Sequence, residues 1–254
     1  MSDALAAGAT IGILGGGQLG RMLALAAAPL GFKVHIFEPG ADCPAAQVAD
    51  RCTTAAYEDE AALDAFAASC DVVTYEFENV PTAALDRIEA RVAIRPNRRA
   101  LAISQDRLDE KTFLQGIGLT TAPFANVEDQ ADLEAAIAQI GTPSILKTRR
   151  MGYDGKGQAR LRSADDRPEV TAPSVLEGFV EFTSEISVIA ARALDGAITC
   201  YDPGENVHLD GILATTTVPA AIARNAELSE QVAALNNRLA QSREVNAEQR
   251  EQHE

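Results

Sequence analysis

A glycine-rich segment near the N-terminus limits most strongly what this chain can fold into. The apolar run 10–14, "TIGIL", leads directly into "GGGQLG" at 15–20. A helical pattern follows and stops at Gly31, and a second apolar run at 33–38 closes a strand–helix–strand unit. Because such a unit joins two parallel strands, the segment predicts a parallel sheet. The predicted apolar face of the helix consists of Leu19, Met22, Leu23, Ala26 and Leu30.

Strands and helices continue to alternate as far as residue 97. This alternation predicts an α/β domain whose parallel sheet is covered by helices on both faces. We place the domain at 1–97, because Pro96 and Asn97 interrupt the pattern. The later segments are a helix at 58–68, a strand at 71–77, a helix at 81–90 and a strand at 92–96.

The second half is richer in strands joined by short links. A charged helix at 104–118 and a second helix at 129–141 precede the strands, so we predict an antiparallel sheet beside two helices at 98–226. The end, 227–254, is polar and helix-prone, and its two apolar heptads are too few for a coiled coil. The predicted strands lie at 144–147, 157–162, 174–180, 185–193 and 197–201.

Composition excludes several classes of function. The net charge of −15 argues against a broad basic face for duplex nucleic acid, although a local cationic pocket stays compatible with it. The four cysteines form no CxxC pair, which favours reduced thiols in a cytoplasmic protein. The N-terminus does not resemble a signal peptide, and no apolar run reaches the length of a membrane span.

The first glycine loop has the GxGxxG spacing, with Gly15, Gly17 and Gly20 between a strand and a helix. Such a loop brings backbone N–H groups close to a ligand phosphate, so we expect it to bind an anion. Glu38 ends the next strand, where a dinucleotide-binding fold would hold ribose hydroxyls. The loop does not distinguish NAD from a phosphorylated substrate, and a tight turn without ligand is the alternative.

Two carboxylates, Glu76 and Glu78, end the strand at 71–77. Ligands of open α/β sheets bind at the carboxyl ends of strands, so these side chains are candidates for the same crevice. One solvated carboxylate and one helix-capping group is the alternative.

A second glycine loop follows the strand at 144–147. Lys147 ends that strand, where its ammonium group could reach a phosphate, and Lys156 adds a second cation. The segment 176–180, "LEGFV", could hydrogen-bond an adenine or ribose. The glycines that would let the loop wrap over phosphates are Gly152, Gly155 and Gly157.

The order of these motifs resembles that of ATP-grasp ligases, and in particular the family of 5-(carboxyamino)imidazole ribonucleotide synthases of purine biosynthesis. The resemblance implies a Rossmann-like pre-ATP-grasp domain at 1–97, an α+β ATP-grasp domain at 98–226 that is incomplete at its C-terminus, and a polar helical tail at 227–254. The matching stretches run from about residue 11 to 219: "GILGGGQLGRML", "YEFENVP", "QDRLDEKTFL", "SILKTRRMGYDGKGQ", "EGFVEFTSEISVIAAR" and "ENVHLDGIL".

The resemblance implies a carbon–nitrogen ligase. The family uses ATP, with Mg²⁺, and bicarbonate to carboxylate the exocyclic amine of 5-aminoimidazole ribonucleotide, and its members are commonly cytoplasmic dimers. Small molecules are therefore the expected partners, together with a second copy of the chain, and neither nucleic acid nor a membrane is expected.

The resemblance also assigns roles to residues, which fall into three groups. Tyr153, Asp154 and Lys156 would lie over the reacting groups as catalytic residues. Gly17, Gln18, Leu19 and Glu76 would bind the aminoimidazole ribonucleotide. ATP would be bound by Arg107, Lys147, the loop Gly152, Tyr153, Asp154, Gly155, Lys156, Gly157 and Gln158, the segment Glu177, Gly178, Phe179 and Val180, and by Glu185 and His208.

The sequence departs from the family pattern after Pro219. The family continues into a strand and an Asn-Glu pair whose two glutamates hold Mg²⁺ ions, and we find no segment after Pro219 that resembles them. We therefore assign no metal ligands and expect this chain alone to have little or no ligase activity. Two alternatives stay open: a non-catalytic nucleotide-binding or assembly module, and an NAD-dependent oxidoreductase based on the first glycine loop.

Overall fold

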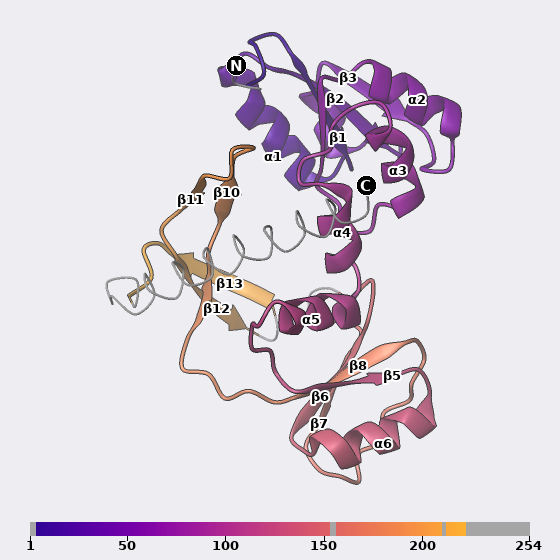
Figure 1. Ribbon diagram of the computed structural model, residues 1–254, viewed down its shortest axis with the longest axis vertical. Coiled ribbons are helices and arrows are strands. Elements are labelled where there is room, and N and C mark those ends of the chain that lie inside the picture. Colours follow the sequence, from indigo (N-terminus) through magenta and orange to yellow (C-terminus); the bar gives the residue numbers. More distant parts are fainter. Residues whose placement is uncertain (1–3, 153–155, 210–211, 222–254) are drawn as a thin grey trace, which may run out of the picture. The chain divides into compact units, whose positions relative to one another are not determined.

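The computed structural model describes residues 4–152, 156–209 and 212–221. The chain divides into two compact units between Asp106 and Arg107 (Figure 1). The domain limits taken from the sequence, 1–97 and 98–226, stay predictions, and the predicted tail at 227–254 lies outside the described residues.

The first unit contains a four-stranded parallel sheet in the order β3-β2-β1-β4. Its central strands are buried almost continuously, as expected for strands covered on both faces. The predicted parallel sheet is therefore present. The strands are β1 (Thr10–Leu14), β2 (Lys33–Glu38), β3 (Arg51–Thr54) and β4 (Val72–Tyr75).

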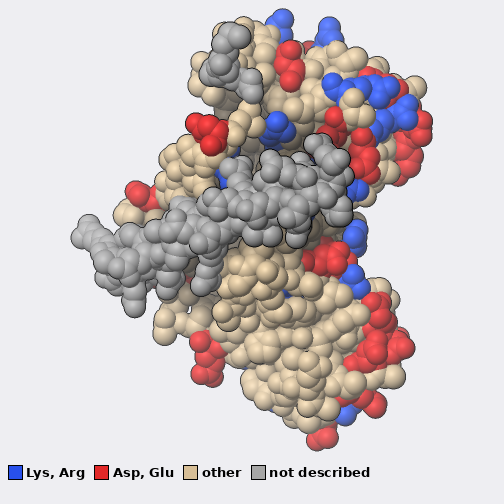
Figure 2. All heavy atoms as spheres, in the orientation of Figure 1, with Lys and Arg blue, Asp and Glu red and all other residues tan. Residues whose placement is uncertain are grey.

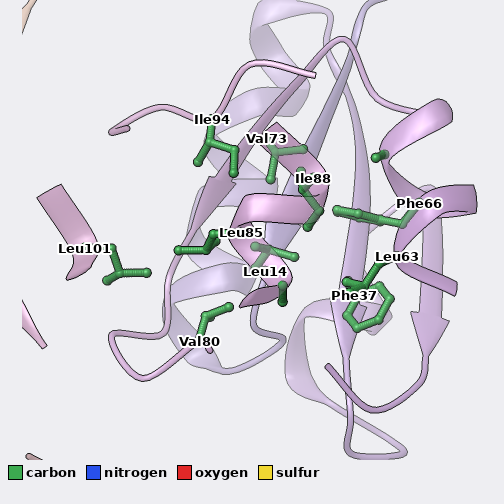
Figure 3. Close-up of a cluster of buried hydrophobic side chains, with 12 residues drawn as sticks. Leu14, Phe37, Leu63, Phe66, Val73, Val80, Leu85, Ile88, Ile94 and Leu101 are labelled. Carbon is green, nitrogen blue, oxygen red and sulfur yellow. The ribbon is translucent and has the colours of Figure 1, made fainter. Parts of the chain in front are cut away.

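Helices of the first unit pack on the sheet through two apolar clusters. Figure 3 shows the larger one, in which Leu14 and Phe37 of the sheet meet Leu63 and Phe66 of α2 and Leu85 of α3. The smaller cluster joins α1 to the other side of β1 and β2. The helical elements are α1 (Gln18–Ala27), η1 (Ala28–Leu30), η2 (Pro44–Gln47), α2 (Glu60–Ala68), α3 (Thr82–Glu89) and α4 (Arg98–Ser104).

Helix α1 buries a different face from the one predicted. Its buried residues are Gly20, Ala24 and Ala27, whereas Leu19 and Met22 of the predicted apolar face are 58% and 56% exposed. A side chain at Gly20 would place its Cβ 2.9 Å from the carbonyl oxygen of Gly15. The helix therefore lies so close to the β1 loop that only small residues fit between them.

The predicted strand at 92–96 is reduced to a single bridge. Ile94 pairs with Val73, through hydrogen bonds from Val73 N to the Ala93 oxygen at 2.9 Å and from Arg95 N to the Val73 oxygen at 2.8 Å. The next residue, Pro96, has no N–H and cannot extend the ladder.

The second unit contains an antiparallel sheet in the order β5-β8-β6-β7. Helix α6 covers one face of this sheet, where Leu146 and Leu176 join the core residues Leu133 and Ile137. The predicted antiparallel sheet with two helices is therefore present. Its elements are α5 (Arg107–Gly116), β5 (Phe124–Val127), α6 (Gln130–Ile140), β6 (Ser144–Thr148), β7 (Gln158–Leu161) and β8 (Ser174–Gly178).

Shorter strands complete the second unit in two small sheets, β13-β12-β9 and β10-β11. The segment 185–193, predicted as one strand, is split into β9 and β10, which pair with different neighbours. Its period-2 pattern does not reveal such a change of partner. These strands are β9 (Glu185–Ser187), β10 (Ala190–Arg192), β11 (Ile198–Cys200), β12 (Gly204–Leu209) and β13 (Ile212–Thr217).

Charge on the surface agrees with the composition. On the face shown in Figure 2, basic side chains lie among acidic ones and form no broad basic area over the described residues. None of the helices in the described ranges combines the length and apolar character needed to cross a bilayer.

One buried histidine makes the stability of the first unit depend on pH. His35 on β2 is 6% exposed, and its Nδ1 and Nε2 lie 2.7 Å from Ser69 Oγ and 2.8 Å from Thr53 Oγ1. Burial, assisted by the charge of Arg51, lowers the pKa of His35 below its usual 6.5. The unfolded chain therefore takes up a proton before the folded one as the pH falls, so stability is kept above pH 6.5 and lost below it.

We predict that His35→Gln reduces this dependence. At neutral pH the variant should lose about 1 kcal/mol, the worth of one net hydrogen bond. Between about pH 7.5 and 5.5 the difference in unfolding free energy between wild type and variant should shrink, because only the wild type carries the titrating imidazole. Denaturant unfolding at each pH, followed by circular dichroism, measures this difference. A difference that stays constant with pH would contradict the prediction.

Candidate functional site

Two predicted site residues meet on adjacent strands of the second unit. Strands β6 and β8 pair with Ile145 opposite Glu177, so Lys147, two residues further along β6, lies on the same face as Glu177. The Lys147 Nζ lies 2.8 Å from the Glu177 Oε2. This face is opposite to the one that carries Leu146 and Leu176 into the core.

A third charged residue, Lys111 of α5, completes the group. Its Nζ lies 3.1 Å from the Glu177 Oε1 and 5.8 Å from the centre of the Phe124 ring, which stands opposite Glu177 on β5. Sequence reasoning missed Lys111, although its segment was recognised. The available signal was its spacing of four from Arg107, which puts both side chains on one helical face.

The carboxylate of Glu177 stays charged in spite of its burial. Glu177 is 7% exposed, and this burial alone would raise its pKa. The hydrogen bond and charge of Lys147, with those of Lys111, outweigh the burial and lower the pKa of Glu177 below its usual 4.5. A negative charge between two positive ones therefore persists at neutral pH.

The base of the second glycine loop is tied to α5 and β6. Arg107 donates from Nη1 to the carbonyl oxygen of Thr148 at 2.7 Å and from Nη2 to that of Gly152 at 2.9 Å. At the other end, Thr148 N donates to the oxygen of Gly157 at 2.8 Å. Gly157 has a φ of +71°, and a Cβ there would lie 2.5 Å from Thr148 Oγ1, so a larger residue would not fit.

The second glycine loop leads into β7. Lys156 is exposed, and Gln158 begins β7 opposite Lys147. The predicted residues Tyr153, Asp154 and Gly155 lie outside the described residues.

The predicted adenine-binding segment leaves β8 at its end. The N–H groups of Gly178 and Phe179 donate to the carbonyl oxygens of Pro123 and Pro143, at 2.8 Å and 3.0 Å. The Phe179 ring lies under the guanidinium of Arg160 at 4.5 Å, and Val180 is exposed.

Glu185 and His208 also come together. Glu185 on β9 pairs with Asn206 on β12, and the His208 Nδ1, two residues further along, lies 3.3 Å from the Glu185 Oε1. Both side chains are partly exposed, at 43% for Glu185 and 35% for His208.

The amides of the first glycine loop are paired with side chains of the first unit. The amides of Gly16 and Gly17 donate to the carboxylates of Glu38 and Glu76, each at 2.7 Å, and Glu38 also accepts from Gly40 N at 2.9 Å. Two side-chain carboxylates therefore satisfy these amides in this structure, and the expected binding of an anion by the loop stays a prediction. Glu38 accepts hydrogen bonds from the loop, and the expectation that it holds ribose hydroxyls stays a prediction.

A pocket of about 470 Å³ lies at the carboxyl ends of β1, β2 and β4. With Glu38 and Glu76 in its wall it favours groups that donate hydrogen bonds over phosphates. Of the predicted substrate residues, Gly17 and Glu76 line it, whereas Gln18 and Leu19 are exposed at the start of α1. Its lining is Gly16, Gly17, Glu38, Pro39, Gly40, Ala41, Asp42, Cys43, Pro44, Tyr57, Glu76 and Phe77.

Metal ligands do not gather in the described parts of the chain. Within 4–152, 156–209 and 212–221 no group of three or more His, Cys, Asp or Glu side chains could hold a metal ion.

Two family models match this chain, one for each of its two units. The family model of the ribonucleotide synthetase preATP-grasp domain matches residues 8–105, and that of the ATP-grasp domain matches residues 112–245. The second match extends beyond Pro219, where we found no resemblance from the sequence.

Curated relatives point the same way. An N5-carboxyaminoimidazole ribonucleotide synthase of Brucella melitensis is 55% identical over 222 residues, covering 85% of this chain and 61% of the relative. One from Staphylococcus aureus strain COL is 40% identical, covering 92% and 63%. The predicted resemblance is confirmed, and the chain spans less than two thirds of the length of these relatives.

Solved structures show the same likeness. An ADP complex of an N5-carboxyaminoimidazole ribonucleotide synthetase superposes with a TM-score of 0.86 at 39% identity, covering 96% of this chain and 66% of that one. An Aspergillus clavatus synthase in complex with ADP and 5-aminoimidazole ribonucleotide gives 0.81 at 29% identity, covering 92% and 63%. The predicted fold class, a parallel-sheet domain followed by an ATP-grasp domain, is confirmed.

We predict that Glu177→Gln destabilises the second unit. Glutamine keeps the size but removes the charge between Lys111 and Lys147, so the loss should be about 3 kcal/mol, as for a broken buried ion pair. Denaturant unfolding measures it. Glu128→Gln, which breaks the more exposed pair with Arg149 at 2.9 Å, is the control and should cost less than about 1 kcal/mol. Equal losses for the two variants would contradict a special role for Glu177.

We predict that Tyr57→Phe leaves stability unchanged or raises it by up to about 1 kcal/mol. The Tyr57 hydroxyl is buried with no hydrogen-bond partner among the described residues, and its pKa is raised by burial and by the charges of Glu38 and Glu76. The phenyl ring keeps the stacking on Phe37, whose ring centre lies 5.6 Å away. Thermal unfolding checks the prediction, and a clear loss of stability would show that the hydroxyl makes a bond.

Proposed function

This chain belongs to the ATP-grasp family, and from that premise we propose that it carries the nucleotide-binding part of a ligase. The reaction proposed is the ATP-dependent carboxylation of 5-aminoimidazole ribonucleotide by bicarbonate, giving 5-carboxyaminoimidazole ribonucleotide, ADP and phosphate. We propose that the enzyme acts in the cytoplasm as a homodimer. The likeness to synthases with that activity supports the reaction, and the four free cysteines agree with a reducing compartment.

The observation that carries the proposal is the pairing of Lys147 with the buried Glu177 at the base of the second glycine loop. A lysine fixed at the end of a strand offers its remaining N–H groups to a phosphate, and Arg107 holds the backbone directly after this strand at Thr148 and Gly152. The neighbouring segment Gly178–Val180, with Glu177, would hold the adenine and ribose side, and Glu185 and His208 would line the site.

The pocket of the first unit suits the second substrate. Aminoimidazole and ribose groups present N–H and O–H donors, and Glu38 and Glu76 are acceptors at the carboxyl ends of the strands. We propose that Gly17 and Glu76 bind the ribonucleotide in this pocket, together with Gln18 and Leu19 at the adjoining start of α1. The phosphate of the substrate would then point away from the two carboxylates.

Catalysis in this proposal comes from positioning and charge. Transfer of the γ-phosphoryl group to bicarbonate makes the carboxyl carbon open to attack by the exocyclic amine, which releases phosphate. Charge on the transferring group spreads over its oxygens, so fixed cations such as Lys147 stabilise it without a protein nucleophile. Tyr153, Asp154 and Lys156 are proposed to lie over the reacting groups.

Magnesium is a proposed cofactor, but the described residues do not fit it. No carboxylate cluster of the required kind occurs in the described ranges. Its ligands would have to come from other parts of the protein, and we assign no step to it.

Binding of ADP tests the nucleotide site directly. Lys147→Met keeps the aliphatic stem and removes the ammonium group, so the dissociation constant for ADP should rise by about tenfold to a hundredfold. Titration calorimetry on the folded chain measures it. Lys33→Met, the same change at an exposed position of the first unit, is the control and should bind as the wild type does.

Two results would count against the proposal. One is a wild-type chain that is folded and does not bind ADP. The other is equal affinity of the wild type and Lys147→Met. Release of ADP that requires both bicarbonate and 5-aminoimidazole ribonucleotide tests whether this chain alone performs the full reaction.

A further inference from the structure

We propose that Lys111 is a positioning residue of the nucleotide site: it occupies one oxygen of Glu177 so that Lys147, bound to the other oxygen, keeps donors for a phosphate. The proposal rests on the proposed function, in which Lys147 binds ATP. Each lysine has its own oxygen, with Lys147 on Oε2 at 2.8 Å and Lys111 on Oε1 at 3.1 Å.

The net charge of Lys111, Lys147 and Glu177 favours the binding of an anion beside them. Two ammonium groups around one carboxylate leave one positive charge in a largely buried place, since the side chains of Lys111, Lys147 and Glu177 are 15%, 24% and 10% exposed. Positive charges held close together with little water repel each other, and a bound anion removes this cost. A structural ion pair would need only one lysine.

The arrangement also distinguishes the two lysines. Lys147 is the more exposed and lies at the end of β6, directly before the loop residues that Arg107 ties down. Lys111 is the less exposed and projects from α5 over Phe124. Lys147, the more exposed of the two, is therefore placed to meet a ligand, and the less exposed Lys111 is placed to hold the carboxylate.

Helix α5 connects this charged group to the second glycine loop. Arg107 and Lys111 are four residues apart and lie on one side of the helix, so one rigid element holds both the loop base and Glu177. Without Lys111, both oxygens of Glu177 would be open to Lys147. The pair would then be neutral, and Lys147 would turn toward Glu177 and away from a phosphate.

The experiment compares ADP with adenosine, which lacks phosphates. Lys111→Met should raise the dissociation constant for ADP by about tenfold and leave that for adenosine unchanged, because the lost donors serve the phosphate. Lys111→Arg keeps the charge and should restore most of the ADP affinity. The dissociation constants come from calorimetry, with circular dichroism to establish folding and Lys33→Met as control.

Each outcome either supports or overturns a positioning role for Lys111. Loss of affinity for ADP alone, rescued by arginine, agrees with positioning. Equal losses for ADP and adenosine would mean a merely structural role and overturn the proposal, as would ADP binding equal to the wild type. If Lys111→Met does not fold, Lys111→Gln and Lys111→Arg carry the same comparison. A folded wild-type chain that does not bind ADP overturns the proposed function, and this inference with it, and is recognised before any variant is made.

Discussion

A carboxylate held between two ammonium groups organises the second unit of this protein. Glu177 lies on β8, Lys147 on the neighbouring strand β6, and Lys111 on helix α5. Three elements therefore converge on one buried charge. A buried charge is tolerated only with partners of this kind. Correct placement of α5 and β6 is therefore a condition for burying the end of β8, and the same placement brings Arg107 to the loop.

The first unit uses carboxylates in a related way. Glu38 and Glu76 leave the ends of β2 and β4 and accept hydrogen bonds from the loop that follows β1. The loop is thus held by side chains from both neighbouring strands. The resulting pocket is acidic, and this favours hydrogen-bond donors where the glycine spacing alone suggested a phosphate.

Sequence patterns predicted the elements better than their contacts. The alternation of strands and helices predicted the parallel sheet, and the motifs placed Lys147 and Glu177 on strands without indicating that these strands are neighbours. The spacing of four puts Lys111 on the same helical face as Arg107, but periodicity does not say that this face turns toward Glu177. For α1 the leucines suggested the buried face, but close approach to Gly15 selected the small residues instead. The hydrogen bonds from the amides of Gly16 and Gly17 to carboxylates join residues far apart in the sequence, so no local pattern predicts them.

The small inner face of α1 acts as a spacer for the pocket. This helix begins at Gln18, directly after the loop amides, so its distance from the sheet sets how deeply its first turn reaches toward Glu76. One methyl group added at Gly20 would be 2.9 Å from a backbone oxygen and 3.2 Å from the Glu76 side chain, and the helix or the carboxylate would have to move. The outer leucines carry no such constraint. Substitutions on the two sides of α1 therefore differ in their effect. A change on the outer side stays local, whereas one added carbon on the inner side alters the geometry of the pocket.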